Sequence, residues 1–318
     1  MYEDYRIQVA LLILDLPASI PVLILSYTLF MLGFLFGQPS RSTLMAKSVP
    51  RQRLGYYVSI TTSAFAASRI LGPYISGLLV VKTSYQLAFG VLAVVALLGA
   101  VLFHIYSVEP GKESCNNMYS RISKAYQRLL RPYPELRRFY LFLIFDRVAW
   151  SLWFPLLSGQ LKDAGYREDM IGLFYTAQSA TMSATSMVWG KLADRIGFLV
   201  IAVSEFLGAL ALAFIYLMKP WIFPLVGLAL VGLSIAAWVP SYNRTIAVLA
   251  RGESLGEAYA SANAVRSIAG AAPPILGGLI YDELGSLSLY GLAVVLLVGA
   301  GIYALYFAER IEQGRGKQ

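Results

Sequence analysis

The sequence predicts an all-helical protein that spans a membrane several times. Apolar residues make up 58% of the 318 residues, charged residues make up only 14%, and the mean hydropathy is +0.62. Apolar runs of about 20 residues, the length at which an α-helix crosses the hydrocarbon core, recur along the chain. These runs are continuously apolar, whereas the strands of an outer-membrane barrel alternate. The pattern therefore favours an integral membrane bundle of α-helices.

Nine apolar windows have the length of a transmembrane helix. In chain order they are 20–46, 55–82, 86–107, 138–160, 170–189, 198–218, 221–244, 256–280 and 286–308. A tenth window, 5–16, is too short to cross the hydrocarbon core. We therefore expect nine full transmembrane helices and one clipped helix at the N-terminal end.

The positions of the basic residues predict the orientation of these helices. When loops are assigned alternately to the two sides, eighteen Lys and Arg residues fall on the side of segment 108–137 and four on the other side. Basic residues accumulate on the cytoplasmic side of a membrane. We expect the C-terminus and segment 108–137 on that side of the cytoplasmic membrane. The segment also carries a basic stripe on an amphipathic helical pattern, which fits an anionic lipid surface.

Rare residues and absent motifs exclude several classes of protein. One cysteine, Cys115, excludes a disulfide framework, and one histidine, His104, excludes zinc sites of the HExxH or paired CxxC kind. The sequence contains no phosphate loop, nucleophile–base pair or metal cluster, so we expect neither an enzyme nor a bound cofactor or metal ion. The net charge of +8 follows the loops of one membrane side, so nucleic acid is not expected as a partner. The expected partners are the lipid bilayer, a small-molecule substrate and protons, with the protein as a monomer.

An ungapped internal repeat relates two parts of the chain. Residues 38–79 match residues 239–280 at an offset of 201 residues. The matched positions are Pro39 with Pro240, Ser40 with Ser241, Leu54 with Leu255, Gly55 with Gly256, Pro73 with Pro274 and Gly77 with Gly278. They lie at turns and helix contacts, which favours duplication over coincidence. The same offset makes 1–17 the counterpart of 198–218 and predicts two further helices before residue 1.

Three motifs resemble those of the major facilitator superfamily. The segment GKLADRIG, residues 190–197, is similar to the superfamily's loop signature Gly-x-x-x-Asp-Arg-x-Gly. It departs from the fuller pattern at Phe198 and Leu199, which stand where basic residues usually follow. The segments GPYISG (72–77) and PPILGG (273–278) resemble the superfamily's Gly-Pro-x-x-Gly-Gly motif, each with one substitution.

This resemblance implies two pseudo-symmetric six-helix halves that transport a small solute by alternating access. Residues 1–107 then form an incomplete N-terminal half equivalent to helices 3–6, residues 108–137 a linker, and residues 138–318 the C-terminal half with helices 7–12. The chain would be an N-terminally truncated transporter that lacks the first two helices. The Gly-Pro motif is commonest in exporters and favours efflux. Its helix-packing positions are Gly72, Pro73, Gly77, Pro274, Gly277 and Gly278.

Charged residues inside apolar windows are candidates for substrate binding or coupling, because a charge at mid-bilayer costs about 2.5–3.5 kcal/mol. Asp146 and Arg147 lie in one such window. Arg147 can bind an anionic substrate and Asp146 can carry a proton. Alternatively, both residues lie in the cytoplasmic third of the membrane and bond to nearby loops.

Two further arginines, Arg69 and Arg266, occupy equivalent helix faces in the repeat. We expect them to pair with Asp4 and Glu205, which the repeat places at the same depth in the two halves. Substrate binding by the arginines and a proton carried by Glu205 are the alternatives.

Aromatic and amide side chains of the helices that line the cavity in the superfamily can hold a ligand by stacking and hydrogen bonds. The candidates are Tyr27, Trp150, Trp153, Gln178, Trp238, Tyr242 and Asn243. Aromatic residues near helix ends also form the interfacial belt, which is the alternative for each of them.

The segment 190–197 is a candidate conformational latch made of Gly190, Asp194, Arg195 and Gly197. The two glycines allow a tight reversal, and Asp194 can accept hydrogen bonds from the N-terminus of a neighbouring helix. Such a contact can form in only one arrangement of the two halves. The alternative is a solvated turn whose charges only set the topology.

Two classes of function remain. The first is a secondary active transporter of a small solute, with a proton gradient as the candidate driving force. The second is a non-transporting membrane scaffold or sensor, or a truncated remnant of a transporter, because the expected halves are unequal.

The latch predicts that Asp194→Asn changes the transport rate and the balance between inward-open and outward-open states, because an amide does not supply the anion that the helix terminus attracts. Transport in proteoliposomes and accessibility labelling from each side measure the two effects. An unchanged rate together with an unchanged balance contradicts the latch.

Overall fold

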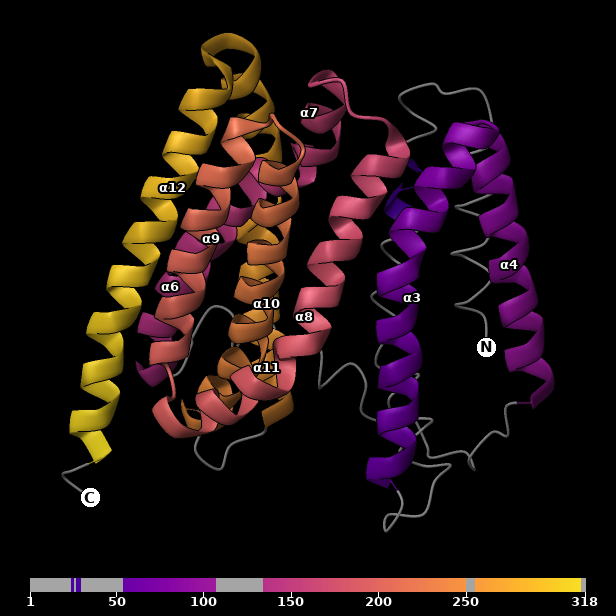
Figure 1. Ribbon diagram of the computed structural model, residues 1–318. Coiled ribbons are helices and arrows are strands. Elements are labelled where there is room, and N and C mark those ends of the chain that lie inside the picture. The colour runs from indigo at the N-terminus through magenta and orange to yellow at the C-terminus, as the bar shows by residue number, and fades with distance from the viewer. Residues whose placement is uncertain (1–23, 26, 30–53, 107–133, 250–254, 316–318) are drawn as a thin grey trace. The chain divides into compact units, whose positions relative to one another are not determined.

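The computed structural model describes residues 24, 25, 27–29, 54–106, 134–249 and 255–315, and all regular structure among them is helical (Figure 1). The all-helical prediction is therefore confirmed. The chain divides into two compact units, the first made of residues 1–114 with 167–172 and the second of residues 115–166 with 173–318. We describe each unit by itself. The domain boundaries expected from the repeat stay a prediction.

The first unit contains two long helices, α3 (Leu54–Lys82) and α4 (Tyr85–Tyr106). They begin and end within one residue of the windows 55–82 and 86–107, so these two predictions are confirmed. Residues 83 and 84 form the turn between them. The Ser84 hydroxyl accepts a hydrogen bond from the backbone N–H of Leu87, 3.1 Å away, and so caps α4.

The second unit holds the other helices, with residues 168–172 of α8 belonging to the first unit. Their bounds are α6 Pro134–Trp153, the 3₁₀ turn η2 Phe154–Leu156, α7 Leu157–Asp163, α8 Glu168–Ile196, α9 Leu199–Leu217, α10 Ile222–Leu249, α11 Leu255–Ala269 and α12 Pro273–Arg315. Pro155 lies in η2, and its missing N–H and fixed φ explain why the window 138–160 bends there.

The window 256–280 breaks at a position that hydropathy does not reveal, whereas the break at Gly285 falls in the predicted gap between this window and the window 286–308. The window 256–280 contains the end of α11 and the start of α12, separated by residues 270–272. Pro273 and Pro274 cannot extend the preceding helix, but they suit the first turn of a new one. A second break lies inside α12 at Gly285, with φ 82° and ψ 172°, and Figure 1 shows α12 turning back at its upper end.

The segment GKLADRIG also differs from the expected eight-residue loop. Helix α8 continues through it to Ile196, so Gly190 is helical and only Gly197 and Phe198 link α8 to α9. Gly197 adopts φ +61°, and its N–H donates a 2.9 Å hydrogen bond to the carbonyl oxygen of Ala193. This left-handed cap is the conformation that glycine supplies at a helix C-terminus. The reversal therefore depends on Gly197 rather than on both glycines.

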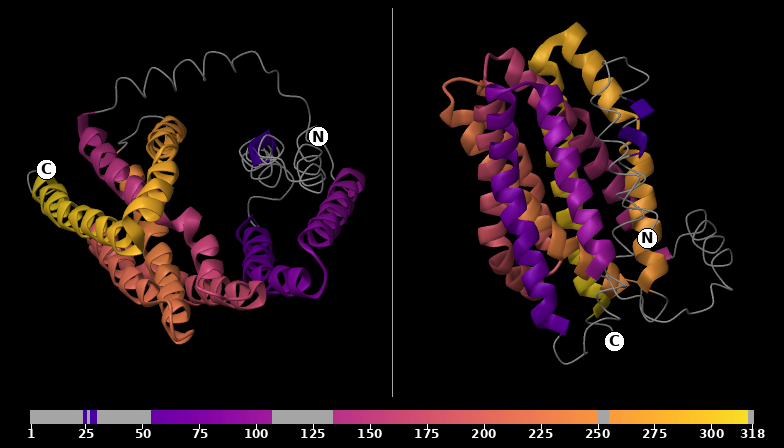
Figure 2. Two further views of the ribbon diagram at one scale, coloured as in Figure 1. Left: turned by 90° about the horizontal axis from the view of Figure 1, so that it is seen from above. Right: turned by 90° about the vertical axis from the view of Figure 1, so that its right-hand side faces the viewer.

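In the second unit, α12 packs along α6 and α9, α9 packs on α10, and α11 packs on α6 (Figures 1 and 2). The buried ring of Phe198 makes edge contacts with Phe139, Phe142 and Phe307 at centroid distances of 5.7, 5.5 and 5.1 Å. Within the described residues, five helical segments are long and apolar enough to cross a membrane, namely 85–106, 136–163, 199–217, 222–246 and 261–308. The expected count of nine full helices stays a prediction.

Gly277 marks a close helix crossing in the second unit. A Cβ atom built on Gly277 would collide with the backbone carbonyl oxygen of Leu152 on α6 and lie 2.9 Å from its carbonyl carbon. The adjacent Gly278 has no atom within 4 Å of the same position. In the first unit, Gly77 approaches the backbone of Glu168 similarly, whereas Gly72 faces open space.

We expect Gly277→Ala to lower the free energy of unfolding by about 1–3 kcal/mol, because the added methyl group forces α12 away from α6. Gly278→Ala is the matched control, and we expect it to be neutral or to stabilise by up to about 1 kcal/mol, since alanine is the better helix former. Thermal unfolding of the full chain in detergent measures both. Equal destabilisation by the two substitutions contradicts the close crossing.

Candidate functional site

The interior of the second unit contains two acidic side chains that are almost completely shielded. Asp146 on α6 is 2% exposed, and Glu205 on α9 is 0% exposed. Their carboxyl groups lie next to each other, and the guanidinium of Arg266 on α11 lies within electrostatic range of both. Three separate helices thus bring ionisable groups to one point inside an apolar bundle. We call Asp146, Glu205 and Arg266 the charge cluster.

The guanidinium of Arg266 rests on an aromatic platform. Its central carbon lies 4.2 Å from the ring centroid of Trp238 and 5.4 Å from that of Tyr242. The two rings are four residues apart on α10, so they share one helix face and stack with a centroid distance of 4.5 Å. A desolvated guanidinium on an aromatic face gains about 2 kcal/mol. The Tyr242 hydroxyl also donates a 3.0 Å hydrogen bond to Oδ1 of Asn263 and so joins α10 to α11.

Arg147 lies against the break between α11 and α12. A Cβ atom on Gly270 would lie 2.6 Å from Nε of Arg147 and 3.0 Å from the hydroxyl oxygen of Ser151. Only glycine fits at this position without a shift of these side chains. The last carbonyl groups of α11 form the negative end of its helix dipole, which favours a cation beside them. Arg147 also acts electrostatically on Asp146.

Several polar atoms of the site have no hydrogen-bond partner among the described residues. They are both carboxyl oxygens of Glu205, Nε1 of Trp238 and Nε of Arg266. Asp146 and Trp238 are near neighbours, yet their geometry falls short of a hydrogen bond. Since most buried polar groups in proteins are hydrogen-bonded, this concentration of unsatisfied atoms is unusual. The site has capacity for a proton or a small polar ligand.

The other predicted ligand-binding residues of this unit mostly lie between helices. Trp153 is fully buried, and Trp150 packs on Gly208 of α9, whose Cβ would lie 2.8 Å from Cζ2 of the indole. Gln178 is buried where its backbone crosses Gly232 of α10. Only Trp238 and Tyr242 of the predicted set contact the charge cluster, whereas the Asn243 side chain is exposed.

The remaining predicted residues lie away from the charge cluster. Arg69 is exposed on α3 of the first unit, and its expected partner Asp4 lies outside the described residues, as does the amphipathic stripe of the linker. The side chain of Asp194 also lies outside the described set, and that of Arg195 is exposed. A Cβ on Gly197 would lie 2.5 Å from Nη1 of Arg244, so an α10 side chain touches this turn.

Sequence reasoning missed three polar contacts that join helices of the second unit. The Tyr290 hydroxyl donates to Oε1 of buried Gln160, and the Ser234 hydroxyl donates a 2.8 Å hydrogen bond to the backbone oxygen of Ser204. The hydroxyls of Tyr140 and Ser261 lie 2.6 Å apart. The only signal in the sequence is a single polar residue within an apolar run, a type that finds partners on neighbouring helices in a membrane.

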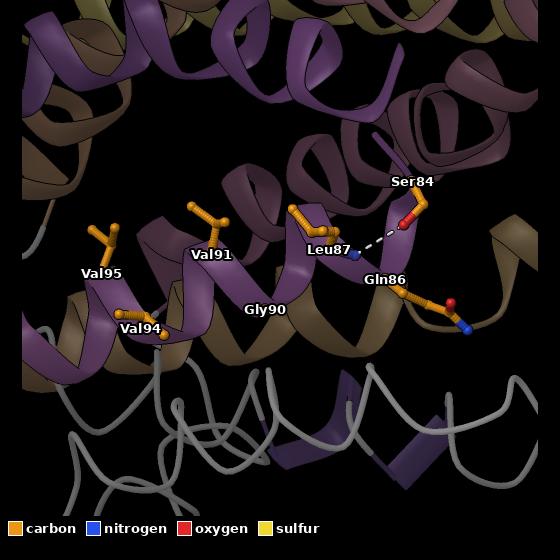
Figure 3. Close-up of a pocket in the computed structure, with 7 residues that line it drawn as sticks. All are labelled: Ser84, Gln86, Leu87, Gly90, Val91, Val94 and Val95. Atoms are coloured by element: carbon orange, nitrogen blue, oxygen red, sulfur yellow. Dashed lines mark hydrogen bonds between the residues drawn. The ribbon is translucent and has the colours of Figure 1, made fainter. Parts of the chain in front are cut away.

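A groove of about 770 Å³ runs along α4 in the first unit (Figure 3). It is lined by Ser84, Gln86, Leu87, Gly90, Val91, Val94 and Val95. The described lining residues belong to α4 and to Ser84 just before it, and none of them offers a ligand a charged or titratable side chain. The charge cluster is therefore the stronger candidate for function.

Comparison with known proteins yields a family and several relatives. The family model described as "Major Facilitator Superfamily" matches residues 7–161 and 139–318. The multi-drug resistance efflux pump PmrA of Streptococcus pneumoniae serotype 4 is 20% identical over 255 residues, which cover 78% of this chain and 63% of the pump. The multidrug resistance protein MdtG of Citrobacter koseri is 24% identical over 281 residues, which cover 86% of this chain and 67% of that protein. The chain thus spans about two thirds of the length of these relatives.

Solved structures show a similar fold at low sequence identity. A variant of the peptide transporter POT has a TM-score of 0.76 and 16% identity, with 98% of this chain and 79% of that chain covered. A POT family transporter in complex with 5-aminolevulinic acid has a TM-score of 0.77 and 13% identity, with 97% and 80% covered.

The geometry predicts that Arg266→Gln lowers the free energy of unfolding by about 2–3 kcal/mol, because it removes the stacked cation beside two buried carboxyl groups. Arg167→Gln is the control: the Arg167 side chain is 67% exposed and lies 3.2 Å from Asp169, an arrangement worth at most about 1 kcal/mol. Thermal unfolding in detergent compares the two variants. A loss at Arg266 no larger than the loss at Arg167 contradicts a stabilising role for the charge cluster.

Proposed function

The chain belongs to the Major Facilitator Superfamily, and we propose that it is a secondary active transporter that moves a small solute across the cytoplasmic membrane by alternating access. The observation that carries this proposal is the charge cluster, because ionisable groups inside a membrane are costly and typically mark a substrate or ion pathway. The halves that would alternate are residues 1–107 and 138–318, joined by the linker 108–137. The excess of basic residues on one side supports a cytoplasmic C-terminus.

We propose efflux as the direction and protons as the coupling ion. Relatives named as efflux or multidrug resistance proteins support the direction, as does the Gly-Pro motif. Among the residues whose burial is described, Asp146 and Glu205 are the only buried acidic ones, and a carboxyl group is the usual proton carrier inside a membrane. Uptake of a proton on one side and its release on the other would then drive the opposite movement of the solute.

We place the solute beside the charge cluster because of the aromatic platform formed by Trp238 and Tyr242. Trp238 and Tyr242 offer ring faces, and Arg266 and Arg147 offer positive charge on neighbouring helices. This combination suits a small solute with both an apolar part and a polar or anionic group. Trp150, Trp153 and Gln178 are proposed to shape the site through the helix contacts that they make.

The proposal predicts that the full chain in proteoliposomes accumulates members of a panel of small anionic and zwitterionic aromatic solutes when a proton gradient is imposed, and that a protonophore abolishes the accumulation. Glu205→Gln should lose gradient-driven accumulation, because an amide carries no exchangeable carboxyl proton. Glu283→Gln is the matched control, since Glu283 is exposed on α12, and it should transport as the unmodified chain does.

The outcomes separate the parts of the proposal. Solute exchange at a rate that does not depend on the proton gradient contradicts proton coupling, but it is consistent with transport. No movement of any member of the panel contradicts transport and favours a non-transporting role.

A further inference from the structure

The charges that face Asp146 and Glu205 come from few elements. Helix α11 supplies Arg266, α6 supplies Arg147, and α10 supplies the neutral Trp238 and Tyr242. Helix α9 adds only the Ser204 hydroxyl, which donates to the Ile201 carbonyl oxygen 2.7 Å away. Helix α12 packs on α6 and α9 but contributes no charged group to the described interactions of the pair.

Arg266 is a single positive charge beside two acidic side chains. It makes no ion pair within 4.0 Å in the described part of the chain, and its guanidinium stacks on the Trp238 ring. Arg147 also acts electrostatically on Asp146, and its Nε lies beside Gly270 at the break after α11. Two negative charges 4 Å apart repel by about 4 kcal/mol even at an effective dielectric constant of 20. Adjacent buried carboxyl groups avoid this cost when one of them holds a proton.

The two carboxyl groups have unequal surroundings. Both carboxyl groups are buried, and burial disfavours a negative charge on either of them. Asp146 faces Arg266, Arg147 and the Trp238 indole, all of which counter this effect. Glu205 has both oxygens buried without a hydrogen-bond partner among the described residues, and the charged groups that act on it are Asp146 and Arg266. The negative charge is therefore better placed on α6 and the proton on α9.

We propose that Asp146 and Glu205 hold a single proton between them, carried by Glu205 and directed at the ionised carboxylate of Asp146, with Arg266 as the counter-ion. The proton site then consists of a pair on two helices rather than one acidic residue. Its proton affinity depends on the contact of α6 with α9, so any movement that separates these helices releases the proton. The use of this release for coupling rests on the proposed function, whereas the shared proton itself does not.

Infrared spectroscopy of the full chain in detergent tests the pair without substrate or gradient. A protonated carboxylic acid has a carbonyl stretching band that carboxylates lack, and the band shifts in heavy water. We expect this band near neutral pH in the unmodified chain and its loss in Glu205→Gln. Asp146→Asn should lower the pH at which the band disappears, because Glu205 then has no adjacent negative charge and faces Arg266 as the only acid. Glu283→Gln is the control and should retain the band at full amplitude.

Each other outcome overturns the proposal. Absence of the band from the unmodified chain excludes a protonated pair, and this measurement requires no variant to fold. A band that remains in Glu205→Gln shows that a group other than Glu205 carries the proton. A band with the same pH dependence in Asp146→Asn as in the unmodified chain shows that burial alone protonates Glu205, so nothing is shared. Because none of these readings involves a solute, a chain that fails to transport can still confirm the pair.

Discussion

The structure of the second unit depends on one constraint, the cost of keeping charge inside a bundle that is otherwise apolar. Asp146 and Glu205 are shielded from solvent, and the nearest compensating charge is Arg266, held on the faces of Trp238 and Tyr242. An arginine suits this position because its planar guanidinium stacks on an aromatic ring while keeping its charge. Four helices, α6, α9, α10 and α11, thus have their rotations linked by one set of polar contacts.

The break between α11 and α12 lies beside Arg147, next to the charge cluster. The interruption at residues 270–272 leaves a glycine where a side chain would collide with Arg147 and Ser151, so the backbone approaches α6 closely at this level. Gly277 of α12, seven residues after Gly270, repeats the close approach at Leu152. Interrupted helices are tolerated in a membrane where neighbouring groups satisfy the freed backbone. Here they let the α11–α12 segment follow α6 past the charge cluster.

The similarity to transporters of known structure concerns the fold alone, because the identities are 13–16% for POT transporters. The functional argument therefore rests on the chain's own residues. A buried acid pair with a stacked counter-ion is not needed to hold helices together, since apolar packing of equal volume is often as stable. Its presence supports a role in moving charge or solute. The family membership supports the same role independently.

The sequence by itself determined the class of the protein and most helix positions. Continuous hydropathy placed α3, α4, α9 and α10 within a few residues of their bounds, because burial in lipid acts on each segment separately. Charge within apolar windows also singled out Asp146, Glu205 and Arg266, and the repeat predicted that Arg266 lies near Glu205. Only the tertiary structure decided that Asp146 lies beside them, that Arg266 stacks on Trp238, and that the chain breaks at residues 270–272. The reason is geometric: a contact between helices depends on their rotation and separation, and a hydropathy pattern contains neither.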